Sequence, residues 1–295
     1  MWRYYIILCM KVSLSFRNRL VVIVGLLFLA LVCIFIVTNN EQPKLKLYFL
    51  NVGQGDAIYI RMPNGSDMLI DGGPGRSVLR ELGNVMPFFD RTIDVVLATH
   101  PDADHIGGLP EVFQKYKVNY FIESGLEGKT DLWKELELRI GEENPERVVV
   151  KDGSKIIFGN VKFEILAPAF ITQDVETNDA SIVGRLVYGE SKFMLTGDAP
   201  IYVENKVVSE HLEPELRANV LKAGHHGSKT SSGENFLASV RPEYTVISAG
   251  KDNRYGHPHA EVIERLNVIK TKILRTDIVG RILFESDGII LRQRP

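Results

Sequence analysis

A short apolar stretch that gives way at once to histidines and aspartates constrains the fold of this chain more than any other feature. Residues 95–99 read Val-Val-Leu-Ala-Thr, and residues 100–105 read His-Pro-Asp-Ala-Asp-His. The apolar run predicts a buried strand whose pairing ends at Pro101, and Gly107-Gly108 allow a tight turn into a helix near Leu109. Loops at the carboxyl ends of buried strands usually carry the chemistry of α/β folds. The stretch therefore predicts an α/β fold with a functional loop here.

The residue types in this loop point to a metal ion. His100, Asp102, Asp104 and His105 offer imidazole nitrogens and carboxylate oxygens within six positions. Such groups, converging on one point, are the ligand set of a divalent ion such as zinc or manganese. The alternative is a polar loop in which an aspartate caps the following helix. One aspartate would suit that alternative, whereas the pattern His-x-Asp-x-Asp-His favours metal binding.

The charge disfavours non-specific binding of long nucleic acid, and the cysteine content excludes two kinds of site in residues 45–295. Residues 1–40 hold four basic side chains and no acidic one, so the other 255 residues carry 31 of the 35 basic side chains against all 37 acidic ones, a net charge of −6. A protein that grips long nucleic acid through non-specific phosphate contacts is usually basic, although a bound metal would offset some of these acids. The only cysteines are Cys9 and Cys33, so residues 45–295 form neither a disulfide framework nor a thiolate metal site.

The amino-terminal residues predict a membrane anchor. Leu20 to Val37 is an unbroken apolar run without charge, close to the minimum length that crosses a bilayer core as a helix. The alternatives are a buried core helix, which usually has a polar stripe, and a cleaved signal peptide, which usually has a shorter apolar run. Basic residues before the run favour a cytoplasmic amino end.

We therefore expect a single-pass protein of the cell membrane whose main domain lies on the extracytoplasmic side. Its predicted parts are a basic cytoplasmic segment (1–19), a transmembrane anchor (20–38), a linker (39–44) and one large domain (45–295).

Strand and helix patterns along residues 45–295 predict a sandwich of two sheets. Apolar runs bounded by turn residues predict strands at 44–52, 57–61, 68–70, 95–99, 118–122, 147–150, 155–158, 161–168, 182–188, 191–195, 219–223, 243–248, 272–275, 281–285 and 289–292. Helices are predicted at 76–88, 110–115, 131–140 and 261–269. Strand-rich halves with interleaved helices favour two β-sheets packed face to face with helices outside, a four-layer α/β/β/α sandwich.

A ligand-type residue follows a short apolar strand at four separate places. These residues are Asp71, the loop His100–His105, Asp198 and His225. Each aspartate could by itself be a turn residue, and His225 could by itself be a buried core histidine. Their recurrence at strand ends predicts that they share one site.

In this order, the motifs resemble those of the metallo-β-lactamase superfamily. They are more similar still to the metallo-β-lactamase-like domain of ComEC-type competence proteins, which take up DNA. The similar segments are Asn-Val-Gly-Gln-Gly-Asp-Ala (51–57), Thr-His-Pro-Asp-Ala-Asp-His-Ile-Gly-Gly-Leu (99–109), Leu-Thr-Gly-Asp (195–198), Leu-Lys-Ala-Gly-His-His-Gly-Ser-Lys-Thr-Ser (221–231) and Asn-Arg-Tyr-Gly-His-Pro-His (253–259). The multi-span channel region of those proteins has no counterpart here, which makes a separate membrane channel a possible partner.

The resemblance implies a ligand set for one or two divalent ions, zinc or manganese. By position, the metal ligands are His100, Asp102, Asp104, His105, Asp198 and His225. Asp71, together with Asp56, is expected to hold these ligands in place through hydrogen bonds. No histidine lies between His105 and His211, so the usual histidine of the first metal position has no match, and Asp102 replaces another. The second position, built from Asp104, His105, Asp198 and His225, is complete.

The same resemblance suggests how a substrate would be handled. A divalent ion lowers the pKa of bound water from 15.7 to about 7. Ser228, Lys229 and Ser231 follow the ligand His225 closely and could bind a phosphate, the alternative being an ordinary polar loop. The expected catalytic residues are Asp104, His226, His257 and Lys229, with the two histidines as candidates for general acid or for holding the leaving group. His259 is expected at the start of a helix instead.

Three functions are compatible with these expectations. The first is a membrane-anchored, metal-dependent phosphodiesterase or nuclease connected with competence and DNA uptake. The second is a hydrolase of a small ester, lactone or β-lactam, which suits the acidic domain equally well. The third is a non-catalytic, metal-stabilised binding module tethered to a channel.

Overall fold

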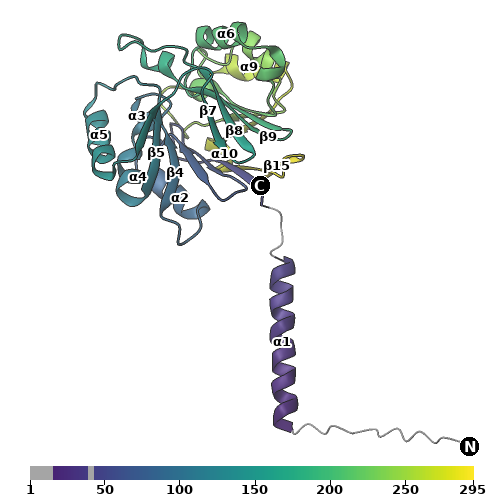
Figure 1. The fold of residues 1–295 in the computed structure, drawn as a ribbon. Coiled ribbons are helices and arrows are strands. Elements are labelled where there is room, and N and C mark those ends of the chain that lie inside the picture. The colour runs from purple at the N-terminus through teal and green to yellow at the C-terminus, as the bar shows by residue number, and fades with distance from the viewer. Residues whose placement is uncertain (1–15, 39–42) are drawn as a thin grey trace, which may run out of the picture. The chain divides into compact units, whose positions relative to one another are not determined.

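The structure is a computed structural model that describes residues 16–38 and 43–295 (Figure 1). The chain divides into two units, residues 1–42 and residues 43–295. The predicted basic segment 1–19 and linker 39–44 lie largely outside the described residues.

The described part of the first unit is one helix, α1 (Phe16–Thr38). Its large apolar side chains from Leu20 to Ile34 are 50% to 68% exposed, apart from Val32, which is partly buried. Within residues 16–38 and 43–295, no helix meets the combined length and apolar character that crossing a membrane requires. The predicted transmembrane anchor is therefore not confirmed.

Two sheets make up the second unit. The first has the order β15-β14-β1-β2-β3-β4-β5-β6. Its strands are β1 (Leu45–Phe49), β2 (Ile58–Arg61), β3 (Asp67–Ile70), β4 (Thr92–Leu97), β5 (Lys117–Glu123), β6 (Glu146–Val149), β14 (Ile282–Ser286) and β15 (Leu291–Arg294). Strands β3 to β6 run parallel to one another.

The second sheet has the order β13-β12-β11-β10-β9-β8-β7. Its strands are β7 (Lys155–Phe158), β8 (Val161–Ala167), β9 (Val183–Tyr188), β10 (Ser191–Leu195), β11 (Val220–Lys222), β12 (Tyr244–Ile247) and β13 (Lys272–Arg275). Strands β10 to β13 are parallel. Each sheet thus has a parallel half whose loops follow the carboxyl ends of neighbouring strands.

The main core lies between the two sheets. Alternate residues of β1, Leu45, Leu47 and Phe49, point into it, as the period of two along a strand requires. Phe193 of β10 and Phe284 of β14 meet there edge to face, with ring centroids 6.1 Å apart. The contact joins the two sheets directly.

Helices cover the outer face of each sheet (Figure 1). The first sheet is covered by α2 (Ser77–Val85), α3 (Ala103–Ile106), α4 (Leu109–Lys115) and α5 (Asp131–Glu143). The second is covered by α6 (Ile201–Glu210), α7 (Glu213–Leu216), α8 (Glu234–Val240) and α9 (Ala260–Val268). The short elements η1 (Thr177–Ala180), η2 (Gly224–Gly227) and α10 (Thr276–Val279) lie in connections. The predicted four-layer α/β/β/α sandwich is confirmed.

Candidate metal centre

The loop after β4 has the form that the sequence predicts. The strand ends at Leu97, and Asp102 precedes the single turn of α3 in extended backbone. Gly108 packs against the loop after β3 so closely that a Cβ there would lie 2.3 Å from Gly72 O. Only glycine permits this approach, which brings the loop carrying His105 against the loop carrying Asp71.

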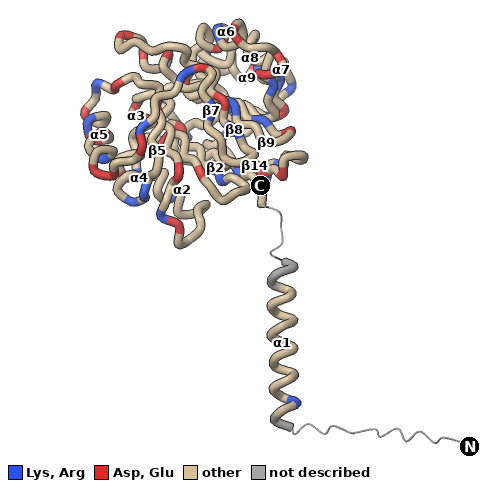
Figure 2. Tube along the Cα trace, viewed as in Figure 1, with Lys and Arg blue, Asp and Glu red and all other residues tan. Residues whose placement is uncertain are grey.

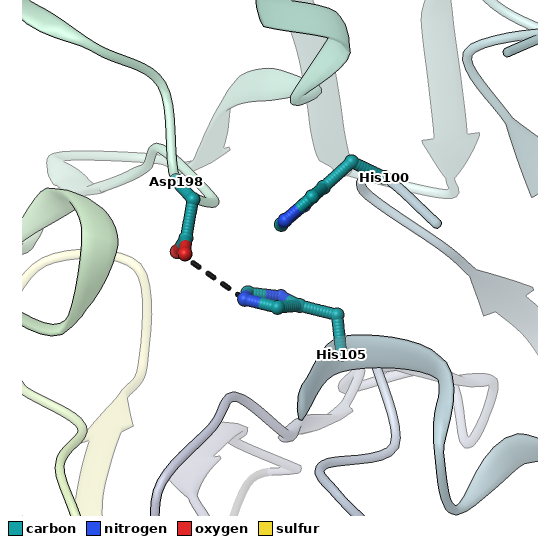
Figure 3. A group of neighbouring side chains, drawn as sticks. All are labelled: His100, His105 and Asp198. Atoms are coloured by element: carbon teal, nitrogen blue, oxygen red, sulfur yellow. Dashed lines mark ion pairs between the residues drawn. The ribbon is translucent and has the colours of Figure 1, made fainter. Parts of the chain in front are cut away.

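Ligand-type side chains from four strand ends converge at the edge shared by the two sheets. His100, His105 and Asp198 point toward one another, with His105 Nε2 3.2 Å from Asp198 Oδ1 (Figure 3). The rings of His100 and His105 have centroids 4.1 Å apart. All three residues are buried. Residues that are far apart in the chain therefore form one group of potential metal ligands.

Asp71 orients His105. Its Oδ2 lies 2.7 Å from His105 Nδ1 and also accepts a hydrogen bond from Thr99 Oγ1 (2.7 Å). Its Oδ1 accepts the backbone N–H of Thr99 (2.8 Å). With Nδ1 held by this carboxylate, His105 directs Nε2 toward Asp198, which is the arrangement by which a carboxylate supports a metal-binding histidine.

Of the two adjacent histidines after β11, the structure places His226 deeper in the cluster. His226 Nε2 lies 3.1 Å from Asp104 Oδ2 and 3.4 Å from Asp198 Oδ2, and Nδ1 contacts Ser248 O (3.0 Å). His225 Nε2 reaches only Asp198 Oδ2, at 3.6 Å, and its side chain is 29% exposed. Asp104, His105, Asp198 and His226 therefore lie together, whereas the sequence predicts His225 as the fourth member of this group.

The predicted first metal position, at His100 and Asp102, is more exposed to solvent. Asp102 Oδ2 lies 3.7 Å from His100 Nε2, and the Asp102 side chain is 37% exposed. No third histidine stands beside them among the described residues, as the sequence predicts. The atoms that lie close enough to His100 to share an ion with it come from His105 and Asp198, and Asp102 is not among them.

Buried atoms without hydrogen-bond partners gather in the centre. Among the described residues, they include His100 Nε2, His105 Nε2 and Asp198 Oδ1. Leaving buried polar atoms unsatisfied is costly, and a cation would satisfy all three at once. The residues present thus fit a divalent ion.

Lys222, to which the sequence analysis gave no role, lies beneath this cluster. It is fully buried, its ammonium pairs with the Asp56 carboxylate, and it donates a hydrogen bond to Gly197 O (2.8 Å). Burial alone would lower the pKa of Lys222, but Asp56 and Asp198 outweigh that effect and raise it. The only sequence signal was a lysine inside the strand predicted at 219–223.

The carboxylates also shape the charge of the histidines. Burial by itself lowers the pKa of His226, but Asp198 and Asp56 outweigh it and raise the pKa to about 9. The pKa of His105 is likewise raised well above its usual range, because Asp198 and Asp71 overcome burial. Burial and the neighbouring His105 hold the pKa of His100 well below its usual value. The centre thus attracts positive charge strongly.

The residues predicted to contact substrate do not all face the same way. Lys229 is exposed, whereas Ser231 is fully buried and donates to Ala199 O (2.8 Å). Ser228 Oγ lies 2.9 Å from Thr230 Oγ1, at the side of the turn that carries His225. The structure therefore uses the Ser231 hydroxyl within the fold and leaves Lys229 free to meet solvent.

His257 lies beside the cluster without entering it. Its ring centroid is 5.6 Å from that of His225 and 6.4 Å from that of His226. Burial and the neighbouring His225 lower the pKa of His257 to about 4. His259 precedes the first residue of α9, which is the helix-start position that the sequence predicts.

Two face-to-face sheets with outer helices, and a buried group of histidines and aspartates at their strand ends, define a metal-binding α/β/β/α protein. The chain belongs to the metallo-β-lactamase superfamily, whose family model matches residues 50–251.

Similar proteins agree with this assignment. The chain is 32% identical over 253 residues to ComE operon protein 3 of Bacillus subtilis, covering 80% of this chain and 32% of that protein. It is 31% identical over 238 residues to the competence protein ComA of Neisseria gonorrhoeae, covering 79% of this chain and 31% of that protein. The predicted resemblance to competence proteins is confirmed. The chain spans about a third of the length of these curated relatives.

A solved structure shares the fold. The metallo-β-lactamase fold protein YhfI from Bacillus subtilis superposes with a TM-score of 0.56 at 11% sequence identity, covering 82% of this chain and 100% of that one.

Proposed function

We propose that residues 43–295 form a metal-dependent phosphodiesterase that acts on nucleic acid. The observation that carries this proposal is the buried cluster of ligand atoms without hydrogen bonds on His100, His105 and Asp198, at the strand ends of a metallo-β-lactamase fold. Similarity to competence proteins over most of the chain supports DNA as the substrate class.

The clustered histidines and aspartates would bind the metal ions. Asp104, His105, Asp198 and His226 would hold one ion, and His100 with Asp102 would contribute to a second. Such an ion, zinc or manganese, supplies Lewis acidity that makes water a competent nucleophile at neutral pH. Asp71 keeps the ring of His105 in the required orientation.

Substrate contacts would come from the turn after β11 and from the loop after β12. The exposed ammonium of Lys229 can pair with a phosphate oxygen, and the Ser228 hydroxyl lies on the same turn. His257 is neutral at pH 7 because its pKa is about 4. It therefore carries no acidic proton to donate, so of the two roles that the sequence suggests for His257 we assign holding the leaving group and not general acid.

Binding of nucleic acid would be local. Figure 2 shows Lys and Arg interspersed with Asp and Glu along residues 43–295. With few phosphate contacts, the affinity for DNA would depend only weakly on salt concentration. We expect recognition of a few nucleotides at the centre.

Exposed apolar side chains on α1 suggest where in the cell the chain lies. The apolar side chains of residues 20–34 are exposed along α1, and an apolar medium would cover them more favourably than water. Basic residues precede this run and favour a cytoplasmic amino end. We propose attachment to the cell membrane through residues 20–38, with residues 43–295 outside the cytoplasm and beside a channel formed by another chain.

The test is hydrolysis by the full-length chain in mild detergent, with single- and double-stranded DNA and either Mn²⁺ or Zn²⁺. We expect cleavage with at least one metal, and Asp104→Ala and His105→Ala to reduce it by more than about 100-fold. Asp131→Ala, at an aspartate whose side chain is 96% exposed, is the matched control and keeps full activity.

Absence of cleavage by the wild-type chain with both metals would reject the proposal. Equal cleavage by the Asp104 and His105 variants would reject it too. Turnover of a chromogenic ester or β-lactam without cleavage of DNA would show instead that the chain is a hydrolase of small esters, lactones or β-lactams.

A further inference from the structure

The buried cation Lys222 contacts two separate segments beneath the metal centre. It is the last residue of β11, and its ammonium pairs with Asp56, in the connection between β1 and β2. The same nitrogen donates to Gly197 O (2.8 Å) and lies 3.6 Å from Asp198 Oδ1, in the loop after β10. One side chain thus ties together segments from both sheets.

If Lys222 only neutralised the charge of Asp56, just one of its three contacts would be explained. A lysine is almost never fully buried unless it is paired, and Asp56 provides a partner. Two of its contacts, however, are to Gly197 and Asp198, the segment that carries a predicted metal ligand. The geometry therefore directs this charge toward the ligand loop as well as toward Asp56.

The negative charge of the carboxylates at the centre explains why a lysine is buried beneath them. The carboxylates of Asp56, Asp71, Asp104 and Asp198 converge around two histidines. Among the described residues, Lys222 is the only lysine or arginine paired with any of these four. Lys222 lies within 3.6 Å of Asp198 Oδ1 and pairs with Asp56, so its charge offsets the repulsion between these two carboxylates.

We propose that Lys222 is a positioning residue, a built-in cation that holds Asp198 in its ligand orientation before any metal ion binds. The centre is then preorganised in the metal-free protein, and binding of an ion requires little rearrangement of the loops after β10 and β11. The backbone agrees, because the N–H of Asp198 donates to Ser181 Oγ (3.1 Å) and that of His225 donates to Gly197 O (3.2 Å).

The first test uses the unmodified full-length chain. Hydrogen–deuterium exchange is measured in EDTA and in saturating Mn²⁺ for peptides that cover residues 196–199 and 222–226. We expect protection in EDTA to lie within about tenfold of protection with Mn²⁺. A gain of more than about tenfold upon Mn²⁺ addition would show that the metal orders these loops, and would overturn the proposal.

The second test separates positioning from neutralisation. The double variant Asp56→Asn/Lys222→Met removes the ion pair and keeps the net charge. If Lys222 positions Asp198, the double variant binds Mn²⁺ about tenfold more weakly than Asp56→Asn alone, which has lost the same Asp56 contacts, by isothermal titration calorimetry. Lys192→Met, which removes a partly exposed lysine from neighbouring β10, is the control and binds as wild type does.

If the double variant binds Mn²⁺ as tightly as Asp56→Asn does, Lys222 only neutralises Asp56, and the proposal is rejected. Because the exchange experiment needs no substitution, a variant that does not fold leaves the proposal open to refutation by the first test.

Discussion

At the scale of single residues, the two histidines after β11 divide their tasks by backbone conformation. Both adopt left-handed backbone, with φ of 46° at His225 and 53° at His226. The turn sends His226 inward, where it is 1% exposed, and leaves His225 at the rim. His226 is therefore the stronger candidate for a metal ligand.

Substitution of each histidine tests this division. His226→Ala removes a nitrogen that lies between Asp104 and Asp198, so we expect Mn²⁺ affinity to fall by about 100-fold or more. His225→Ala should lower it by about tenfold or less, since Asp198 is the one carboxylate that this ring reaches, at 3.6 Å. Calorimetric titration of the metal-free chain measures both. A larger loss for His225→Ala would reverse the assignment.

The sequence predicted which strand ends meet but not the detail within each loop. Asp71, Asp198 and the His100–His105 loop could be found because each follows a short apolar run. The choice between His225 and His226 depends on two left-handed residues inside η2, which no local pattern specifies. Lys222 could not be assigned, because its partner Asp56 is distant in the chain and meets it only in the folded sandwich.

At the scale of elements, Glu204 links α6 to the start of α8. Its carboxylate accepts the backbone N–H groups of Ser232 and Gly233, both at 2.7 Å. Burial raises the pKa of Glu204 from 4.5 to about 7, against the lowering effect of these hydrogen bonds.

This shift makes the folding stability depend on pH. Between pH 4.5 and 7, the folded carboxyl keeps its proton while the unfolded one loses it. The stability that Glu204 contributes is therefore present below pH 4.5 and is lost as the pH rises toward 7, by ~3 kcal/mol. Urea unfolding in EDTA measures the free energy of unfolding of wild type and of Glu204→Gln. The wild-type value minus the variant value should fall by this amount between pH 4.5 and pH 7. Glu234→Gln, on α8, is the control, and parallel curves for wild type and Glu204→Gln would contradict the expectation.

The apolar run on α1 makes a separate prediction. Leu27→Arg places a charge among exposed apolar side chains and costs about 2.5–3.5 kcal/mol if this segment lies in a bilayer. We expect the wild-type chain to sediment with membranes after alkaline washing and the variant to be partly released. Leu138→Arg, at an exposed leucine of α5, should behave as wild type. Wild-type chain found only in the wash would exclude membrane attachment.

Strands were easier to predict than helices. Every predicted strand has a counterpart, because short apolar runs between turn residues are clear signals. The helix predicted at 76–88 ends at Val85, since Pro87 disfavours helical backbone at Met86. Helices α6 and α8 were not predicted. The α6 sequence mixes buried Val203 and Val207 with a buried glutamate, which obscures its apolar face.

At the scale of the whole molecule, contacts between the sheets should dominate stability. Phe284 of β14 lies against Phe49 in its own sheet and against Phe193 and Tyr244 in the other, with centroids 6.2, 6.1 and 5.3 Å away. Phe284→Ala should lower the free energy of unfolding by about 3–5 kcal/mol. Phe88→Ala, at a ring 79% exposed, should change it by less than about 0.5 kcal/mol. Similar losses for both variants, measured by chemical denaturation, would refute this view of the core.

The order in which the ligands occur along the chain governs when the centre can exist. His100, Asp104 and His105 belong to loops of the first sheet, whereas Asp198 and His226 follow strands of the second. A nascent chain that has left the ribosome only as far as β9 has none of the second group. The group of ligand-type side chains is thus complete only late in synthesis, and an interrupted translation product lacks it.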